Sequence, residues 1–552
     1  MDNQLRTITM GQLLDEAVAG HPDNDALVYV DRDFRMTYRE FASVVDRLAK
    51  GLMAMGVARG EKVAIWATNI PYWVALQFAT ARIGAVLLTV NTNYRSDELA
   101  YLLQQSECEN LFLIDGYMDT DYLQTVYDLV PELRSQDRGQ LNAPGFPHLK
   151  RVFFLGMEKH RGMYALPEVM AVGDLVSESD YRDRQEQLDA HDVVNMQYTS
   201  GTTGFPKGVM LTHYNIVNNG FWIGENQKFS PADRVCLPVP LFHCFGCVLG
   251  VLAAVSHAAT LVVLEKFDPV QVMAAVEQEK CTALYGVPTM FIAILDHGLF
   301  DKFDFSSLRT GIMAGSPCPV HVMRQVIDRM YMHEITICYG LTEGSPVITQ
   351  TMPGDDMRRR TETVGRPMPH IEVKITDPET GEEKGPGEQG EVCCRGYNVM
   401  RGYYNMAEAT AKTIDADGWL HTGDLGVLDA DGYLAITGRY KDMIIRGGEN
   451  IYPREIEEFL YQLEGVVDVQ VVGVPSKKYG EEVGAFVIKK SDSDLTGQDI
   501  RDFCRGRISR YKIPKHVAFV DGYPMTASGK IQKYKLQELS VDTFPGPDRI
   551  RP

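Results

Sequence analysis

One short run of small and hydroxyl-bearing residues stands out for its chemistry: Tyr198-Thr-Ser-Gly-Thr-Thr-Gly-Phe-Pro-Lys-Gly208. Its glycines let backbone N–H groups approach a phosphate closely, its hydroxyls donate hydrogen bonds, and Lys207 adds a compact positive charge. The apolar residues 193–196 lead into it and predict a strand. Because Lys207 does not directly follow a glycine, this is not a Walker A motif. We interpret it as a phosphate-binding loop rather than an ordinary Gly/Thr-rich turn.

A second motif, Tyr339-Gly-Leu-Thr-Glu343, follows the apolar residues 335–338. An aromatic face suits a purine, and a carboxylate beside a polyphosphate is tolerable only through a cation. An acid at a helix N-terminus is the simpler interpretation of Glu343, and it is compatible with the metal role. The pattern therefore favours a nucleotide and a divalent cation.

Three further motifs lie downstream. Gly418-Trp-Leu-His-Thr-Gly-Asp424 ends in a carboxylate, which can accept two hydrogen bonds from a ribose diol. Residues 438–450 form a Gly-rich stretch with several charges, and residues 524–533 contain Ser-Gly-Lys530. Alone, each is an unremarkable turn, interdomain loop or surface lysine.

In this order the motifs resemble those of the adenylate-forming enzymes, which comprise acyl-CoA synthetases, peptide-synthetase adenylation domains and beetle luciferases. The resemblance covers nearly the whole chain, and in its details it is closest to medium-chain fatty acyl-CoA synthetases. It implies that Tyr339 stacks on adenine, Thr342 contacts the α-phosphate, Asp424 binds the ribose and Lys530 assists adenylation. The ATP- or AMP-binding residues implied are Thr199, Ser200, Gly201, Thr202, Thr203, Gly204, Lys207, Gly315, Ser316, Pro317, Tyr339, Gly340, Thr342, Asp424, Arg439 and Lys530.

The resemblance also implies two half-reactions at one site. A carboxylate attacks Mg·ATP to give an acyl-adenylate, with Glu343 and Thr202 as the Mg²⁺ residues, and coenzyme A then takes the acyl group. Lys441 occupies the hinge position between the two states. Gly447 and Gly448 would line the channel for the thiol arm, where a Cβ would obstruct it.

The acyl substrate is less well defined. By resemblance His243 lies beside the carboxylate, although a lone histidine is more often structural. The candidate pocket residues are Trp222, Phe242, His243, Cys247, Val287 and Met313. Their bulk favours a medium-chain aliphatic acid. An aromatic or alicyclic acid, or transfer to a carrier protein instead of coenzyme A, stays open. A luciferase-like oxidase or a non-enzymatic ATP-binding module is disfavoured.

Helix and strand signals alternate along the chain and predict an α/β protein with a largely parallel sheet. Thr37-x-x-Glu40 is a capping box before a helix that ends near Gly56, and residues 62–67 and 86–90 predict strands. Between residues 115 and 189 we expect a polar, loop-rich connection. The predicted architecture is a large N-terminal domain of stacked αβ subdomains with a small β-barrel-like module, residues 1–438. A small mobile α+β domain, residues 439–552, follows it.

Bulk composition limits the partners. The net charge of -19 argues against a nucleic-acid-binding protein. The tail is nearly neutral, however, and carries a basic cluster between Arg501 and Lys515, read either as a solvated helix face or as a docking patch for a polyanion. Neither a secretory signal nor a membrane span is visible, so we expect a cytoplasmic enzyme acting on small molecules, with a homodimer left open. The ten cysteines predict reduced core residues, not a disulfide or zinc framework.

Overall fold

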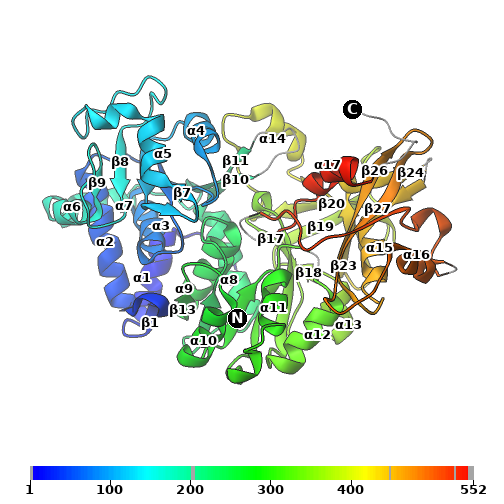
Figure 1. The fold of residues 1–552 in the computed structure, drawn as a ribbon. Helices are drawn as coiled ribbons and strands as arrows, with labels where there is room; N and C mark the ends of the chain where they lie inside the picture. Colours follow the sequence, from blue (N-terminus) through cyan, green and yellow to red (C-terminus); the bar gives the residue numbers. More distant parts are fainter. Residues whose placement is uncertain are drawn as a thin grey trace. The chain divides into compact units, whose positions relative to one another are not determined.

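A computed structural model describes residues 4–199, 206–316, 318–446, 449–505, 507–526 and 530–544. The chain forms two compact units (Figure 1). Unit 1 comprises residues 1–361, 365–372 and 394–420, and unit 2 comprises residues 362–364, 373–393 and 421–552. Residues 421–438 thus group with the C-terminal residues. The boundary at 438/439 stays a prediction.

Unit 1 contains an eight-stranded sheet whose central strands are parallel and buried. Its order is β21-β11-β10-β4-β3-β5-β8-β9. The bounds are β3 Lys62–Trp66, β4 Val86–Thr89, β5 Asn110–Leu113, β8 Arg151–Phe154, β9 Tyr164–Ala165, β10 Val193–Thr199, β11 Lys207–Thr212 and β21 Gly402–Tyr403. Strand β10 is parallel to β4 and antiparallel to β11, so the predicted phosphate loop leaves the sheet between two neighbouring strands.

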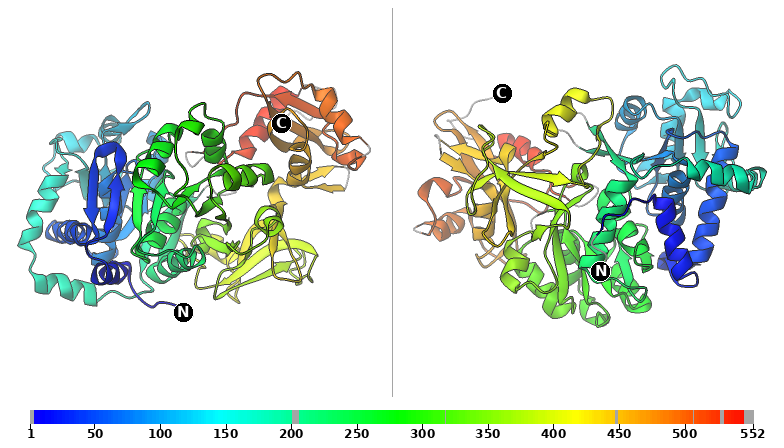
Figure 2. Two further views of the ribbon diagram at one scale, coloured as in Figure 1. Left: turned by 90° about the horizontal axis from the view of Figure 1, so that it is seen from below. Right: turned by 180° about the vertical axis from the view of Figure 1, so that it is seen from behind.

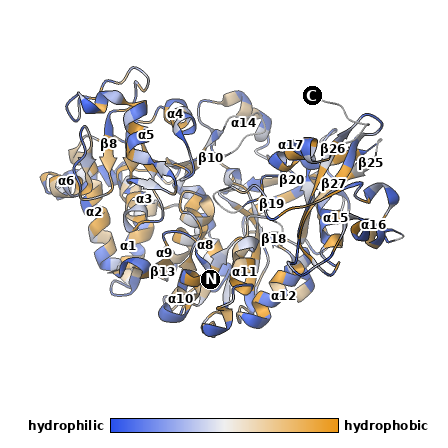
Figure 3. Ribbon diagram, in the orientation of Figure 1, coloured by the Kyte–Doolittle hydropathy of each residue, from blue (hydrophilic) through white to orange (hydrophobic). Residues whose placement is uncertain are grey.

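The helices beside this sheet begin and end where local chemistry requires. The Thr37 hydroxyl accepts a hydrogen bond from the Glu40 N–H, and the Glu40 carboxylate accepts one from the Thr37 N–H, which confirms the capping box at the start of α2 (Tyr38–Ala54). Helix α3 (Pro71–Ile83) ends at Gly84, whose φ of 71° suits a residue without a Cβ. Together with α1 (Met10–Gly20) these helices pack side by side (Figures 1 and 2). Along such helices the ribbon changes between apolar and polar residues, as their burial requires (Figure 3).

A nine-stranded sheet forms the second layer of unit 1, in the order β18-β17-β16-β15-β14-β12-β13-β1-β2. Its bounds are β1 Asp25–Tyr29, β2 Phe34–Thr37, β12 Arg234–Leu237, β13 Thr260–Val263, β14 Ala283–Gly286, β15 Thr310–Ala314, β16 Glu334–Gly340, β17 Val347–Gln350 and β18 Arg366–Pro367. The helices that connect or flank these strands are α8 (His213–Asn226), α10 (Pro269–Glu279), α11 (Pro288–Leu295) and α12 (Val320–Arg329). Parallel β15 and β16 bring their carboxyl ends to one edge of the sheet.

The apolar residues 245–255, before β13, form two consecutive helical segments of different type. Residues Phe245–Gly250 form a π-helix that continues directly into α9 (Val251–Val255). All of these residues are buried, and so is β13, which follows them. A Cβ on Gly246 would lie 2.4 Å from the carbonyl oxygen of Pro240, so only glycine fits this close approach.

The prediction of a loop-rich connection between residues 115 and 189 is wrong. The segment contains the strand pair β6 (Gly116–Tyr117) and β7 (Thr120–Asp121), the last two strands of the eight-stranded sheet, β8 and β9, and three α-helices: α5 Tyr122–Leu129, α6 Leu166–Val172 and α7 Glu178–Glu186. These elements are short, and α7 buries only Tyr181. Such weak apolar periodicity is indistinguishable from a polar loop in the sequence.

Unit 2 contains most of a four-stranded sheet, in the order β19-β20-β22-β23, and a five-stranded sheet made of β24 to β28. The strands are β19 Ile371–Thr376, β20 Gln389–Gly396, β22 Leu420–Leu428, β23 Leu434–Arg439, β24 Ile444–Arg446, β25 Glu449–Ile451, β26 Val466–Ser476, β27 Gly480–Lys489 and β28 His516–Phe519. Helices α15 (Pro453–Leu460), α16 (Gly497–Cys504) and α17 (Lys533–Thr543) accompany the second sheet. A core around Ile456, Val471 and Ile500 lies within it. The predicted α/β class, with a large N-terminal part and a smaller α+β C-terminal part, is confirmed.

Two bulk predictions agree with the structure. All ten cysteines are buried free thiols. Among the described residues, no helix has the length and apolar character needed to cross a membrane.

Candidate active site

The strongest chemical feature of unit 1 is a nearly buried carboxylate where two sheets meet. Glu343, 8% exposed, lies just after β16 in a short 3-10 helix, Thr342–Gly344. Its Oε1 accepts a hydrogen bond from the Tyr403 hydroxyl at 2.8 Å and lies 3.4 Å from Thr199 Oγ1 at the end of β10. Burial, and then the charge of Glu343, raise the pKa of Tyr403, so this phenol stays protonated and donates.

Lys207 joins the same group through the ring of Tyr403. Its Nζ lies 4.3 Å from the centroid of that ring. Strand pairing fixes the lysine as well, because Lys207 opens β11 directly opposite Thr199. Thr199, Lys207, Glu343 and Tyr403 are named here the Glu343 cluster. It unites one acid, one base and two hydroxyls that are far apart in the sequence.

The structure thus brings together three predicted site residues and adds Tyr403, which sequence reasoning missed. The predicted residues Ser200, Gly201, Thr202, Thr203, Gly204, Pro317, Gly447 and Gly448 lie outside the described residues. Their roles stay predictions.

The residues predicted to line the adenine lie at one sheet edge. Gly315 and Ser316 follow β15, and Tyr339 and Gly340 end β16, its parallel neighbour. Gly315 has a φ of 93°, and a Cβ on Gly340 would lie 1.8 Å from the Pro346 carbonyl oxygen. Both glycines are therefore required by the backbone, and Tyr339 is half-buried beside them.

The thiol of Cys244 contacts both His243 and the turn that contains Glu343. Cys244 Sγ lies 3.7 Å from His243 Nδ1 and 3.7 Å from Thr342 Oγ1. His243 Nδ1 accepts the Phe245 N–H at 3.2 Å, which fixes the ring over the start of the π-helix. This places His243 near Thr342, as the candidate carboxylate-binding role requires.

The other predicted acyl-pocket residues are buried on separate elements. Trp222 lies on α8, Phe242 before the π-helix, Cys247 within it, Val287 at the start of α11 and Met313 on β15. Cys247 Sγ accepts a hydrogen bond from Gln197 on β10 at 3.3 Å. A common cavity among them stays a prediction.

Unit 2 carries the predicted ribose-binding acid. Asp424, 5% exposed, lies on β22 opposite Arg439 on β23, and its Oδ1 is 2.9 Å from Arg439 Nε. The Asp424 N–H donates to Thr422 Oγ1 at 3.1 Å, which holds the turn before it.

A second group of polar side chains supports this turn. His421 Nδ1 lies 2.9 Å from Glu391 Oε2 and 3.5 Å from Cys393 Sγ. Within the described ranges this is the one cluster of three metal-type donors close enough to share an ion. Glu391 Oε1 also accepts the Gly423 N–H at 3.0 Å. Both carboxylate oxygens are thus engaged within the protein, and they fix the strand segment that carries Asp424.

Lys441 and Lys530 occupy connecting segments of unit 2. Lys441 is exposed in the 3-10 turn Tyr440–Asp442. Lys530 is half-buried, and its N–H donates to Thr526 Oγ1 at 3.0 Å while its carbonyl accepts the Thr526 N–H at 2.7 Å. Lys533 Nζ then anchors the start of α17 to Glu457 at 2.5 Å.

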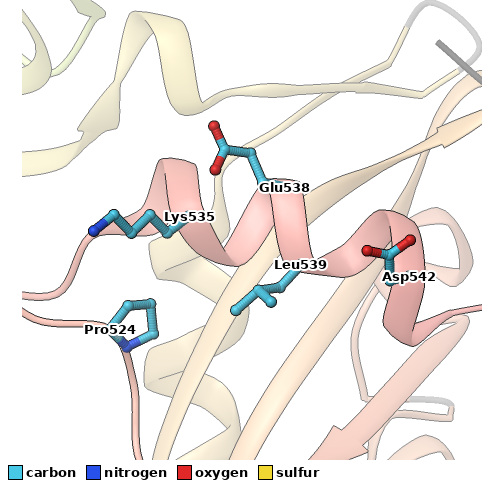
Figure 4. Close-up of a pocket in the computed structure, with 5 residues that line it drawn as sticks. All are labelled: Pro524, Lys535, Glu538, Leu539 and Asp542. Carbon is cyan, nitrogen blue, oxygen red and sulfur yellow. The ribbon is translucent and has the colours of Figure 1, made fainter.

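One surface hollow in unit 2 lies apart from these residues. Pro524, Lys535, Glu538, Leu539 and Asp542 line it along the outer side of α17 (Figure 4). Its mixed, shallow lining contains none of the predicted site residues.

Comparison with known families identifies the chain. The sequence model described as "AMP-binding enzyme" matches residues 14–404, and "AMP-binding enzyme C-terminal domain" matches residues 455–530. The chain belongs to the AMP-binding enzyme family.

Three relatives illustrate the similarity of this AMP-binding enzyme to characterised sequences and structures. YngI of Bacillus subtilis (strain 168), provisionally named an acyl-CoA synthetase, is 56% identical over 97% of this chain and 98% of its own. The mitochondrial medium-chain acyl-CoA ligase ACSF2 of Mus musculus is 40% identical over 97% of this chain and 88% of its own. The crystal structure of ATP-bound MatB from Rhodopseudomonas palustris is 27% identical, with a TM-score of 0.83, and covers 98% of this chain and 100% of its own.

The match to residues 14–404 includes the whole Glu343 cluster. Asp424, Arg439 and Lys441 lie between the two matched regions. The predicted site residues belong in part to unit 1 and in part to unit 2.

Proposed function

We propose that this AMP-binding enzyme is an AMP-forming acyl-CoA synthetase for medium-chain fatty acids. It joins a carboxylic acid to ATP, releasing pyrophosphate, and then transfers the acyl group to coenzyme A, releasing AMP. The observation that carries the proposal is the Glu343 cluster. In it a nearly buried carboxylate and a lysine flank the segment between β10 and β11. The 40% identity to a medium-chain acyl-CoA ligase supports the substrate class.

The charges of the two reactants determine what the residues of the first half-reaction must do. A carboxylic acid is already ionised at pH 7, so its attack on the α-phosphorus needs positioning and charge neutralisation, not a general base. Lys207 offsets charge on the β- and γ-phosphates, and Thr199 orients the loop between β10 and β11. Thr342 contacts the α-phosphate and His243 the substrate carboxylate. Lys530 offsets the charge that builds as the two anions meet.

The donor chemistry of Glu343 fits Mg²⁺. Carboxylate and hydroxyl oxygens are the ligands Mg²⁺ favours, and both the Tyr403 and Thr199 hydroxyls lie on Oε1. We therefore assign Oε2 of Glu343, together with Thr202, to the cation. When bound, Mg²⁺ would lower the charge repulsion among the phosphate oxygens. Asp424 and Arg439 take the ribose, and Tyr339 takes the adenine.

The second half-reaction uses the other predicted residues of unit 2. Gly447 and Gly448 leave room for the pantetheine arm. The backbone conformation at Lys441 changes between the two half-reactions. The thiolate of coenzyme A attacks the acyl carbonyl and AMP leaves with the electron pair of the broken anhydride bond. We also propose that the enzyme acts in the cytoplasm, where ATP and coenzyme A are available. Its molar mass in solution tests whether it forms a homodimer.

A substrate panel tests this function. Pyrophosphate release is measured with saturated acids of four to sixteen carbons, benzoate and cyclohexanecarboxylate. AMP release is measured with and without coenzyme A. We expect the highest kcat/KM at medium chain length and AMP release only with coenzyme A. A higher kcat/KM for benzoate or cyclohexanecarboxylate would show that the substrates are ring acids and not medium-chain fatty acids. Failure of coenzyme A to release AMP from a formed adenylate would favour a carrier-protein acceptor.

A further inference from the structure

We propose that Tyr403 is the positioning residue that aligns the cation-binding carboxylate and the phosphate-binding lysine of this site. The inference rests on the proposed function, because it takes Glu343 and Lys207 as the groups that meet Mg·ATP. It assigns two separable tasks to one side chain: the hydroxyl acts on Glu343 and the ring face acts on Lys207.

The hydroxyl fixes one oxygen of Glu343. The contact of 2.8 Å is a charge-assisted hydrogen bond from a phenol to a carboxylate, and Tyr403 is only 5% exposed. A carboxylate held at Oε1 cannot rotate freely, so Oε2 keeps one direction. Octahedral Mg²⁺ tolerates little error in ligand placement, and a free rotor would weaken its binding.

The ring holds Lys207 by a different interaction. An ammonium 4.3 Å from an aromatic centroid is attracted to the negative face of the ring. This contact leaves the ammonium hydrogens free to meet phosphate oxygens, whereas an ion pair with Glu343 would compete with them. Tyr403 therefore separates the lysine from the acid while keeping both at the site.

The backbone around Tyr403 is itself anchored to both partners. Strand β21 pairs with β11, with Tyr403 opposite Val209, two residues after Lys207. The Met400 N–H donates to the Glu343 carbonyl at 2.9 Å, and Asn398 Nδ2 donates to the Gly344 carbonyl at 3.1 Å. Backbone hydrogen bonds and strand pairing thus tie the segment 398–403 to the Glu343 turn and to β11, which carries Lys207.

The neighbouring residue provides a matched control. The Tyr404 hydroxyl donates to the Glu107 carboxylate at 2.7 Å, and its ring lies 5.3 Å from Lys62 Nζ. Tyr404 therefore has the same chemistry, acid plus lysine, but with partners that the proposed mechanism does not use. Loss of its hydroxyl tests for a general effect of removing a phenol that is hydrogen-bonded to a carboxylate.

The experiment compares Tyr403→Phe, Tyr403→Leu and Tyr404→Phe in the full chain. Binding of Mn²⁺ is followed by electron paramagnetic resonance in the presence of α,β-methylene ATP, so no turnover is needed. For Tyr403→Phe we expect about 10- to 100-fold weaker Mn²⁺ binding with little change in nucleotide affinity, since only the hydrogen bond is lost. Tyr403→Leu should in addition weaken binding of the metal-free analogue by about 3- to 30-fold, because the ring is lost. Tyr404→Phe should match wild type in both titrations.

Every other outcome contradicts either the positioning role of Tyr403 or the metal role of Glu343. Wild-type Mn²⁺ binding by Tyr403→Phe, with weakened binding by Glu343→Gln, would overturn the positioning role and leave the proposed function intact. Equal losses in Tyr403→Phe and Tyr404→Phe would show a structural effect and also overturn it. Wild-type Mn²⁺ binding by Glu343→Gln would instead remove the metal role of Glu343, on which the inference rests. Thermal unfolding midpoints of the three tyrosine variants, measured alongside, identify any that fails to fold. If Tyr403→Phe is such a variant, Thr199→Val, which removes the second hydroxyl at Oε1, should weaken Mn²⁺ binding, and wild-type binding by it would overturn the proposal.

Discussion

Asp424 and Arg439 face each other across two antiparallel strands, with the carboxylate oxygen Oδ1 2.9 Å from the guanidinium Nε. The acid is nearly buried, while about half of the arginine side chain is exposed. Arg439 therefore holds Asp424 in place from one side while much of its own side chain stays exposed. Strand register thus aligns the proposed ribose-binding acid with the proposed nucleotide-binding arginine.

We expect Asp424→Asn to lower kcat/KM for ATP by about 10- to 100-fold, because an ionised acceptor for two ribose hydroxyls is lost. The amide keeps the shape of the side chain. Rates with ATP and with 2′-deoxy-ATP provide the diagnostic comparison. Wild type should prefer ATP, and the variant should lose most of that preference. A variant that discriminates as well as wild type would place the ribose elsewhere.

Lys530→Ala should abolish adenylate formation and spare thioester formation from supplied acyl-AMP. Its charge matters only where two anions approach each other, and loss of one such group costs about 10²- to 10³-fold. Pyrophosphate release and AMP release from preformed acyl-AMP are measured on the same preparation. Lys535→Ala, a lysine that lines the hollow in Figure 4, is the control. An equal loss in both half-reactions would contradict this division.

Lys441→Pro tests the hinge. Proline fixes φ near -65° and removes an N–H, so a pivot at this residue would be locked. The variant should still release pyrophosphate in a single-turnover burst, and transfer to coenzyme A should become very slow. Lys441→Ala, which loses the side chain but keeps the backbone freedom, should retain both rates. If Lys441→Pro transfers supplied acyl-AMP at the wild-type rate, the chain pivots at another residue.

A buried histidine gives unit 1 a predictable sensitivity to acid. Burial lowers the pKa of His213 to about 4, and its Nδ1 accepts the Met10 N–H at 3.1 Å. In the unfolded chain the pKa of this histidine is near 6.5. Between about pH 6.5 and pH 4 the unfolded state therefore binds a proton that the folded state does not bind. The contribution of His213 is therefore complete above pH 6.5 and is lost as pH falls toward 4.

We expect His213→Asn to weaken the pH dependence of the urea midpoint between pH 7 and pH 5. Asparagine can still accept the Met10 N–H but does not titrate. In wild type this one group should cost about 2 kcal/mol over that range. His21→Asn, at an exposed position, is the control. An unchanged pH dependence in His213→Asn would show that other groups dominate acid sensitivity.

The sequence predicted strongly periodic elements well. The capping box at Thr37 and the strand before the phosphate loop appear where expected, because a few consecutive residues carry each signal. It also identified Thr199, Lys207 and Glu343, since their motifs stand directly after strands. The structure adds what those motifs share: one aromatic residue in contact with both the lysine and the acid.

Tyr403 could not be found in this way. It lies far along the chain from Lys207 and Glu343, and no spacing links Gly402-Tyr403-Tyr404 to either. Only the pairing of β21 with β11 brings it to the site. The failure between residues 115 and 189 has a related cause, since strands as short as β8 and β9, with four and two residues, are stabilised by the sheet they join.

The π-helix at Phe245–Gly250 has a consequence for how the enzyme can diversify. A π-turn holds one residue more than an α-turn. Deleting one residue there would allow the segment to close as an α-helix and would rotate its upstream side chains by about 100° relative to α9. Cys247 and its neighbours would then exchange places around the helix while the β-sheet stayed unaltered. At the proposed acyl-pocket residue Cys247, changes in gene length, and not only codon replacements, thus offer a route to new acyl specificities.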